Sequence, residues 1–377
     1  MLAVSRSIED KGGTPIWAVP PAYTQAQPVH DCGYEVHGAP LIRGVNKPHA
    51  HRIDSFADIL LNLGFSEPLC FEVLVRDWMR LIEKIRPDRV ILDYAPAAQL
   101  AALFLGVESF QITNGFDAPP PECPIFGYSA RGPYIEKKNS QKIGQLESTL
   151  AALKGLSHNQ ESPGIADYFA YPFKIYDCLP EADPYSPRTY GIYVGPLSVR
   201  NKEHDEQPIP WSEYETSSDR IKIFAYLRGI SDARELLDAI GACKADAVCV
   251  WPDIPAEFLG RPHPYVYVQR EPINMHEALR IAHAVINYGS TTTVNQTLLM
   301  GKPQLMIPND LEKIITSQTV EKNGAGITHQ RRASYQDEIS RLIHAKQERN
   351  AALKISQKYS GDCFSKNKTY FLARLIS

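Results

Sequence analysis

The sequence predicts an α/β protein built of two domains. With 377 residues, the chain is longer than one hydrophobic core of ordinary size usually accommodates. Helical and strand patterns alternate along it, which is typical of layered α/β domains, and a polar, charge-rich segment at 199–219 interrupts the alternation. We therefore expect one domain over residues 1–200 and another over 201–377, with a ligand in the cleft that the two domains face.

The elements of the first domain follow from hydrophobic spacing and from the positions of glycine and proline. A helical pattern at 2–10 and a strand at 14–19 are each ended by these residues. A long amphipathic stretch at 55–86 keeps its apolar residues at helical spacing. The other elements expected in this domain are strands at 90–92, 109–113 and 191–194 and a helix at 97–105. Residues 122–200 are otherwise less regular.

The second domain repeats the alternation and contains a turn rich in small residues. Its first elements are expected to be strands at 221–227, 247–251, 265–269 and 284–286 and helices at 232–243 and 275–281. Residues 287–293 then read Asn-Tyr-Gly-Ser-Thr-Thr-Thr, and a helical pattern follows at 294–300. Such a turn points N–H groups and hydroxyls at one spot, where the helix dipole favours negative charge. This geometry suits a diphosphate, and a polar helix N-cap is the alternative.

Composition argues against several classes of protein. The net charge of −3, without a block of lysine or arginine, argues against nucleic-acid binding. The 7 cysteines are scattered and never form a C-x-x-C pair. This pattern fits reduced thiols in a cytoplasmic protein rather than a disulfide or zinc framework. No apolar run reaches membrane-spanning length, and the first residues lack the basic and apolar regions of a signal peptide.

Five motifs occur in a fixed order in the second half of the chain. They are Tyr288-Gly289-Ser290-Thr291-Thr292-Thr293, Met300-Gly301-Lys302-Pro303, Gln304 to Pro308, Glu312-Lys313 and Gly324-Ala325-Gly326. In this order they resemble GT-B glycosyltransferases of the UDP-glycosyltransferase type, particularly bacterial relatives of the glucosyl- and glucuronosyltransferases. The first half matches through Arg86-Pro87-Asp88, Asp93-Tyr94-Ala95-Pro96, Gly115-Phe116, Glu181-Ala182-Asp183-Pro184 and Gly195-Pro196. The resemblance covers nearly the whole chain and implies two Rossmann-like domains facing across a cleft.

The resemblance also implies where the substrates bind. In this family the C-terminal domain binds the nucleotide sugar, here a UDP-sugar or another NDP-sugar, and no further cofactor is expected. The residues that would hold the diphosphate are Gly289, Ser290, Thr292 and Thr293. Glu312 would accept hydrogen bonds from the donor sugar unless it is only a solvated carboxylate, and Pro272 and Ile273 would meet the base. The N-terminal domain would bind a small-molecule, lipid or glycan acceptor, and peripheral membrane association stays open.

The chain departs from the family pattern at three places. Tyr288 stands where the family keeps a pyrophosphate-binding histidine, and tyrosine carries no positive charge near neutral pH. Lys313 replaces a glutamine, and this cation favours a negatively charged sugar or phosphate unless it is simply a surface lysine. Family members also open with a buried strand and a Gly-rich loop that often carries the general base. The sequence begins at the following helix, so that strand is expected to be absent.

Asp93 is the candidate catalytic residue. It follows the expected strand at 90–92, where a side chain would face the cleft. In relatives with a histidine base, an aspartate at this place orients the histidine, as in a catalytic triad. No early histidine matches that partner, so Asp93 acts as the base itself or caps the helix near Pro96. His49 and His51 are an alternative in an acceptor loop, or free surface histidines.

Two functions follow from these residues. The first is inverting glycosyl transfer, in which a deprotonated acceptor hydroxyl displaces the nucleoside diphosphate at the anomeric carbon and helix N–H groups take the leaving charge without a metal. The second is a degenerate homologue that binds a nucleotide sugar or a partner without turnover, as the departures suggest. A GT-B epimerase has less support, because no carboxylate constellation for proton abstraction stands out.

Overall fold

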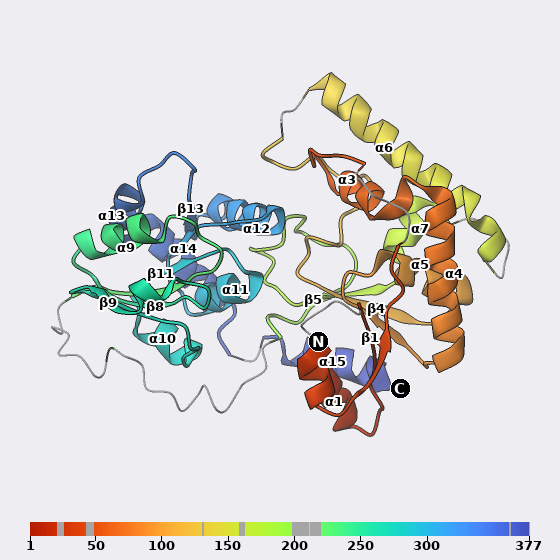
Figure 1. Ribbon diagram of the computed structural model, residues 1–377, viewed down its shortest axis with the longest axis horizontal. Helices are drawn as coiled ribbons and strands as arrows, with labels where there is room; N and C mark the ends of the chain where they lie inside the picture. Colours follow the sequence, from red (N-terminus) through yellow and green to blue (C-terminus); the bar gives the residue numbers. More distant parts are fainter. Residues whose placement is uncertain are drawn as a thin grey trace. The chain divides into compact units, whose positions relative to one another are not determined.

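The chain divides into two compact units. The computed structural model describes residues 1–20, 26–42, 49–129, 132–157, 163–197, 211, 220–361 and 363–376. Unit 1 consists of Met1–Asp177, Pro187–Val194 and Lys366–Ser377, and unit 2 of Cys178–Ser186 and Gly195–Ser365 (Figure 1). The expected boundary between residues 200 and 201 lies outside the described residues.

Unit 1 contains a four-stranded parallel sheet and a separate parallel pair of strands. The larger sheet has the order β3 (Val90–Leu92), β4 (Ser109–Thr113), β5 (Phe173–Tyr176) and β6 (Ile192–Tyr193). The pair consists of β1 (Ile16–Val19) and β2 (Glu35–Gly38). The helices of this unit are α1 (Leu2–Glu9), α2 (Ala26–Asp31), α3 (Phe56–Leu60), α4 (Pro68–Ile85), α5 (Pro96–Leu105), α6 (Pro133–Ala152), α7 (Ile165–Ala170) and α15 (Ser365–Ile376), with shorter helical turns η1 (Leu61–Phe65) and η2 (Lys154–Leu156).

The last helix belongs to unit 1, whereas the sequence places residues 366–377 in the second domain. In α15, Phe371 is buried, and its ring centroid lies 6.4 Å from that of Phe110 in β4. The Nδ2 group of Asn367 donates to the carbonyl of Tyr193 at 2.7 Å. Burial of the Phe371 ring against the sheet stabilises the packing of α15 on unit 1. The helix therefore joins the first unit, although the residues that precede it belong to the second.

The amphipathic stretch at 55–86 is three helical segments rather than one. The break lies at Gly64, whose φ of +110° is unfavourable for any residue with a Cβ atom. A Cβ atom at this position would come within 3.3 Å of the Phe71 ring and would clash with Ile42. Pro68 then opens α4, because proline fits the first turn of a helix and its missing N–H is not needed there.

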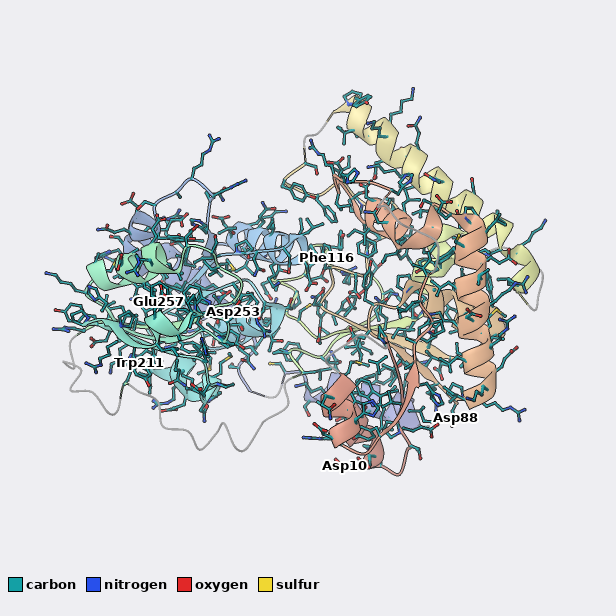
Figure 2. All side chains as sticks on the ribbon, in the orientation of Figure 1. Asp10, Asp88, Phe116, Trp211, Asp253 and Glu257 are labelled. Carbon is teal, nitrogen blue, oxygen red and sulfur yellow. The ribbon has the colours of Figure 1, made fainter. Side chains whose placement is uncertain are left out.

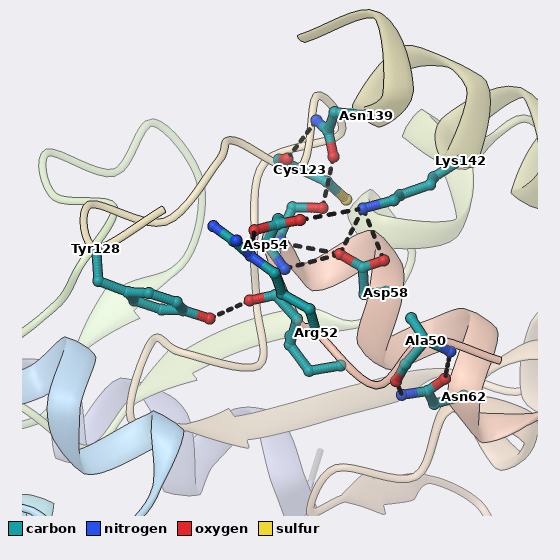
Figure 3. A network of polar contacts seen from close by, with 11 residues as sticks. Ala50, Arg52, Asp54, Asp58, Asn62, Cys123, Tyr128, Asn139 and Lys142 are labelled. Atoms are coloured by element: carbon teal, nitrogen blue, oxygen red, sulfur yellow. Dashed lines mark hydrogen bonds and ion pairs between the residues drawn. The ribbon is translucent and has the colours of Figure 1, made fainter. Parts of the chain in front are cut away.

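The 20-residue helix α6 was not expected from the sequence. Its polar side chains fix it to the start of α3 (Figure 3). Lys142 Nζ lies 2.7 Å from Oδ1 of the buried Asp58, and the Ser55 hydroxyl donates to Asn139 Oδ1 at 2.5 Å. Asn139 Nδ2 in turn donates to the carbonyl of Cys123 at 2.9 Å. Leu146 and Leu150 of α6 are also fully buried, but most of its side chains are polar, so hydrophobic periodicity gives little sign of this helix.

Unit 2 is built on a seven-stranded sheet with the order β13-β12-β11-β7-β8-β10-β9. The strands are β7 (Lys222–Tyr226), β8 (Asp246–Val250), β9 (Gly260–His263), β10 (Val266–Gln269), β11 (Ala284–Asn287), β12 (Gln304–Met306) and β13 (Gly326–Thr328). All neighbours are parallel except β9 and β10. The helices are α9 (Ala233–Ala242), α10 (Met275–Ile281), α11 (Thr291–Leu299), α12 (Leu311–Lys322), α13 (Tyr335–His344) and α14 (Lys346–Lys358), with the short turn η4 (Ala256–Phe258).

Two hydrophobic clusters use alternate residues of the central strands of unit 2. Ile223 and Ala247 belong to the cluster that also holds the apolar residues of α9 and α13. Phe224, Val248 and Val285 belong to the cluster on α10. A parallel sheet buried on both faces explains why these strands are almost continuously apolar. In the part of the chain that the structure describes, no helix is both long and apolar enough to cross a membrane.

Candidate functional site

The carboxyl edge of the unit 2 sheet has a topological switch point between β7 and β11. From β7 the chain proceeds to β8 and β10 on one side, whereas β11 pairs with the other side of β7. In open α/β sheets, ligands bind outside the carboxyl ends of the strands at such a switch point. The turn predicted to bind a diphosphate follows β11 and lies at this edge.

Gly289 gives the turn its shape. Its φ is +82°, and its N–H donates to Asn287 Oδ1 at 2.8 Å. A Cβ atom here would lie 2.9 Å from Ser317 Oγ and 3.1 Å from Lys313 Cβ, so helix α12 leaves room for glycine alone. Because its N–H is already used inside the turn, Gly289 shapes the site and is not a free donor.

Helix α11 starts directly after this turn. Its N-cap, Ser290, makes no side-chain cap hydrogen bond, since its hydroxyl donates to Thr293 Oγ1 at 2.9 Å. Thr293 is buried and Thr292 is exposed. The first turn of α11 therefore combines the positive end of the helix dipole, backbone N–H groups not capped by Ser290 and an exposed threonine, which together favour an anion.

Two tyrosines and one lysine lie beside the turn. The Tyr288 ring centroid is 5.8 Å from that of Tyr226, and Lys313 Nζ lies over the Tyr288 ring at 5.3 Å. Burial raises the pKa of Tyr226 above its ordinary value. Tyr226 was not expected from the sequence to belong to the site. Its place as the last residue of a strand at the switch point is the signal that could have found it.

The remaining predicted donor residues lie in the loop after β10 and at the start of α12. Pro272 is exposed in the loop after β10, whereas Ile273 is only 6% exposed and packs in the cluster on α10. Glu312 lies in the first turn of α12, next to Lys313. Asp253, labelled in Figure 2, follows β8 and accepts a hydrogen bond from the N–H of Gly229 at 2.7 Å. Ile273 is therefore a core residue, whereas Pro272 lies in a loop and Glu312 lies at the start of a helix.

Unit 1 gathers three aspartates at the carboxyl ends of adjacent parallel strands. Asp93 follows β3, Asp117 lies in the loop after β4, and Asp177 follows β5. Burial raises the pKa of each of them above the ordinary value for aspartate. Only Asp93 was expected from the sequence, because its two neighbours in space are 24 and 84 residues away along the chain.

The three carboxyl groups differ in their hydrogen bonding. Asp117 accepts a hydrogen bond from Gln111 Nε2 at 3.1 Å and another from the Thr113 hydroxyl. Asp177 has a buried Oδ1 atom without a hydrogen-bond partner in the described structure. Its pKa rises to about 7 through burial, with further contributions from the negative charges of Asp117 and Asp93. This edge can therefore hold or accept a proton near neutral pH.

The residue that follows Asp93 has a strained backbone. Tyr94 has a φ of +44°, which residues other than glycine rarely adopt. Its ring packs edge-on against Phe56, with the centroids 5.8 Å apart.

His49 and His51, the alternative to Asp93, are exposed. Among the described residues, no three or more histidine, cysteine or acidic groups are placed to hold a metal ion.

Solved structures of glycosyltransferases match the chain over nearly its whole length. The calicheamicin glycosyltransferase CalG4 matches with a TM-score of 0.68 at 18% identity, over 100% of this chain and 95% of that one. The glycosyltransferase VinC in complex with dTDP matches with 0.63 at 15% identity, again over 100% and 95%. The spinosyn rhamnosyltransferase SpnG complexed with spinosyn aglycone matches with 0.62 at 16% identity, over 95% and 91%.

The chain has the GT-B fold. The predicted α/β class, with a Rossmann-like unit in each half, is thereby confirmed. No protein family matches the chain by sequence, and no curated protein does either. The narrower likeness to glucosyl- and glucuronosyltransferases stays a prediction.

Proposed function

We propose that this protein is a glycosyltransferase that moves a sugar from a nucleoside-diphosphate donor to an acceptor hydroxyl with inversion. The observation that carries the proposal is the start of α11 at the switch point of the unit 2 sheet, where the first turn has no side-chain cap from Ser290. A pyrophosphate fits such a helix start in both size and charge. Two of the matched structures support the assignment, since VinC was solved with dTDP and SpnG with its aglycone.

On this proposal, unit 2 binds the donor. The backbone N–H groups of the first turn of α11 and the Thr292 hydroxyl hold the diphosphate, and the hydrogen bond from the Ser290 hydroxyl to Thr293 fixes the start of the helix. Glu312 accepts hydrogen bonds from the donor sugar, and Pro272 borders the base. The base is uracil or thymine, which differ only by a methyl group and present the same hydrogen-bonding edge.

Unit 1 supplies the proton acceptor. Asp93 takes the proton from the acceptor hydroxyl as the oxygen forms its bond to the anomeric carbon. The bond from that carbon to the donor phosphate oxygen breaks, and its electron pair leaves with the nucleoside diphosphate. Asp93 is exposed by surface area, yet desolvation of its carboxyl group raises its pKa above the ordinary value for aspartate, and a carboxylate with a higher pKa is a stronger base, which suits this step. The helix dipole and N–H groups of α11 stabilise the charge on the leaving diphosphate.

The experiment that tests the proposal measures turnover and binding separately. Purified protein is incubated with a panel of UDP- and dTDP-sugars, and release of free sugar or nucleotide is followed. Titration calorimetry with UDP and dTDP is run in parallel. Donor hydrolysis that is abolished in Asp93→Asn, with nucleotide affinity retained, is the expected result. Absence of both turnover and binding would refute the assignment.

A binding protein without turnover is the second candidate. The observation in its favour is that Tyr288 occupies the place in the turn where the resembled family keeps a histidine, and tyrosine cannot supply a positive charge. Saturable nucleotide binding combined with undetectable hydrolysis across the whole panel would select this candidate over the enzyme.

A further inference from the structure

Lys313 is held against the diphosphate turn by packing on two sides. Its Cβ atom lies 3.1 Å from the place that a Cβ atom of residue 289 would occupy. Its Nζ atom lies over the ring of Tyr288 at 5.3 Å, and the side chain is only 20% exposed. A lysine that projects freely from a helix surface has none of these restraints, so the ammonium group is positioned and not merely solvated.

The ammonium group of Lys313 is paired with Asp310 in the structure. Asp310 is the N-cap of α12, and its Oδ1 atom accepts the N–H of Lys313 at 3.0 Å. Its Oδ2 atom forms the ion pair with Lys313 Nζ. One carboxylate thus caps the helix with one oxygen and holds the lysine with the other. Only the second of these contacts depends on its negative charge.

This ion pair is weak compared with the contact that a diphosphate would offer. The Asp310 side chain is 51% exposed and three residues from Lys313 on the same helix, and such surface pairs contribute little. A diphosphate carries at least two negative charges and several acceptor oxygens, and it would lie on the N–H groups of α11. Charge-assisted hydrogen bonds to phosphate are the stronger kind.

We propose that Lys313 is the cation of the donor diphosphate site and that its ammonium group stays paired with Asp310 while the site is empty. On binding, Lys313 Nζ exchanges the Asp310 carboxylate for a phosphate oxygen, and Asp310 keeps its capping contact with the backbone. The positive charge that Tyr288 does not provide then comes from the neighbouring helix. The inference rests on the proposed function, because it takes the ligand to be a nucleoside diphosphate.

The proposal gives the two residues opposite effects on affinity. Lys313→Met removes the cation and weakens the binding of UDP or dTDP about tenfold or more. Lys313→Arg keeps the charge and stays within about threefold of the wild type. Asp310→Asn removes the competing charge but keeps an N-cap oxygen, so it strengthens binding by about threefold. In the Lys313→Met background the gain from Asp310→Asn shrinks, because no ion pair is left to break.

The test is calorimetric titration of UDP and of dTDP into the full-length protein and these variants. A matched control comes from α10, where Glu277 and Arg280 form an exposed pair with the same spacing of three residues. Glu277→Gln and Arg280→Met should leave the affinity unchanged. Thermal melting of every variant shows that the fold is intact.

Two negative results separate the inference from the function beneath it. If the wild type binds UDP or dTDP and Lys313→Met binds it equally well, the role of Lys313 is overturned and the donor site stands. If the wild type binds neither nucleotide, the donor site and the inference fall together. The third outcome concerns Asp310 alone. If Asp310→Asn raises the affinity for UDP or dTDP as much in the Lys313→Met background as in the wild type, Asp310 does not act by pairing with Lys313.

Discussion

Substituting aspartate for Thr292 separates the stability of α11 from the function proposed for it. Thr292 is exposed in the first turn of the helix. A carboxylate in this turn interacts favourably with the helix dipole and should raise the stability of the helix by about 0.3–1 kcal/mol. The same charge opposes a diphosphate at the same N–H groups. The two effects therefore have opposite signs, which no general loss of structure can produce.

The magnitude follows from Coulomb's law for an exposed position. Two like unit charges about 4 Å apart repel by about 4 kcal/mol at the effective dielectric constant of a protein surface and by about 1 kcal/mol in water. Thr292 is exposed, so an intermediate value of about 2 kcal/mol applies. At room temperature this corresponds to about a 30-fold loss of affinity.

The assay is titration of UDP and dTDP together with thermal melting of Thr292→Asp and two reference variants. Thr292→Ala reports the loss of the hydroxyl alone, and Gln336→Asp adds the same charge to the first turn of α13, which is also exposed. We expect Gln336→Asp to bind nucleotide like the wild type. If Thr292→Asp binds UDP and dTDP within about threefold of the wild type, the start of α11 is not the diphosphate site.

Three further predictions test other features of the structure. Asp177→Asn should stabilise the protein above pH 7 but not below pH 4: burial raises the pKa of Asp177 from 3.8 to about 7, so the folded chain keeps a proton that the unfolded chain releases. Wild-type stability should therefore fall as pH rises between these values, by up to about 4 kcal/mol in urea denaturation, and an equal effect of the variant at both pH values would contradict this. Lys142→Met should lower the free energy of unfolding by about 3 kcal/mol, because the Asp58 side chain is 0% exposed and loses its cation; addition of Asp58→Asn should restore part of it, and full stability of the single variant would argue against the pair. Tyr288→His in the Lys313→Met background should recover nucleotide affinity at pH 6 but not at pH 8, since only the protonated imidazole is charged; recovery at both pH values would show that charge is not the cause.

The sequence predicts many of the strands because their burial leaves a local signal, whereas β2 and β5 were not expected. Residues 90–92 and 284–286 are short apolar runs, residues 109–113 alternate polar and apolar side chains, and each of the three is a strand in the structure. Helix α6 leaves no such signal. Its side chains are mostly polar, and it is held by contacts such as Lys142 with Asp58, whose partners are 84 residues apart. Contacts of this range do not show in the spacing of a single segment.

In the candidate site, too, local features can be predicted from the sequence and contacts between distant residues cannot. The turn at 287–293 can be predicted because consecutive small residues determine its geometry. The aspartates that gather beside Asp93 in unit 1 cannot be predicted in this way, since Asp177 reaches that edge only when β5 adds to the sheet beside β4. Lys313 could be located from the motif, but a sequence does not show that its helix packs on Gly289 closely enough to exclude a Cβ atom.

The position of α15 has a consequence for how the protein is made. Unit 1 begins at Met1, yet its buried Phe371 and the bond from Asn367 to Tyr193 come from the far end of the chain. A ribosome therefore synthesises all of unit 2 before it makes the last segment of unit 1. During synthesis the sheet around Phe110 waits with an aromatic face uncovered, a state in which exposed apolar surface invites aggregation. Unit 1 is thus the first of the two units to be started during translation and the last to be completed.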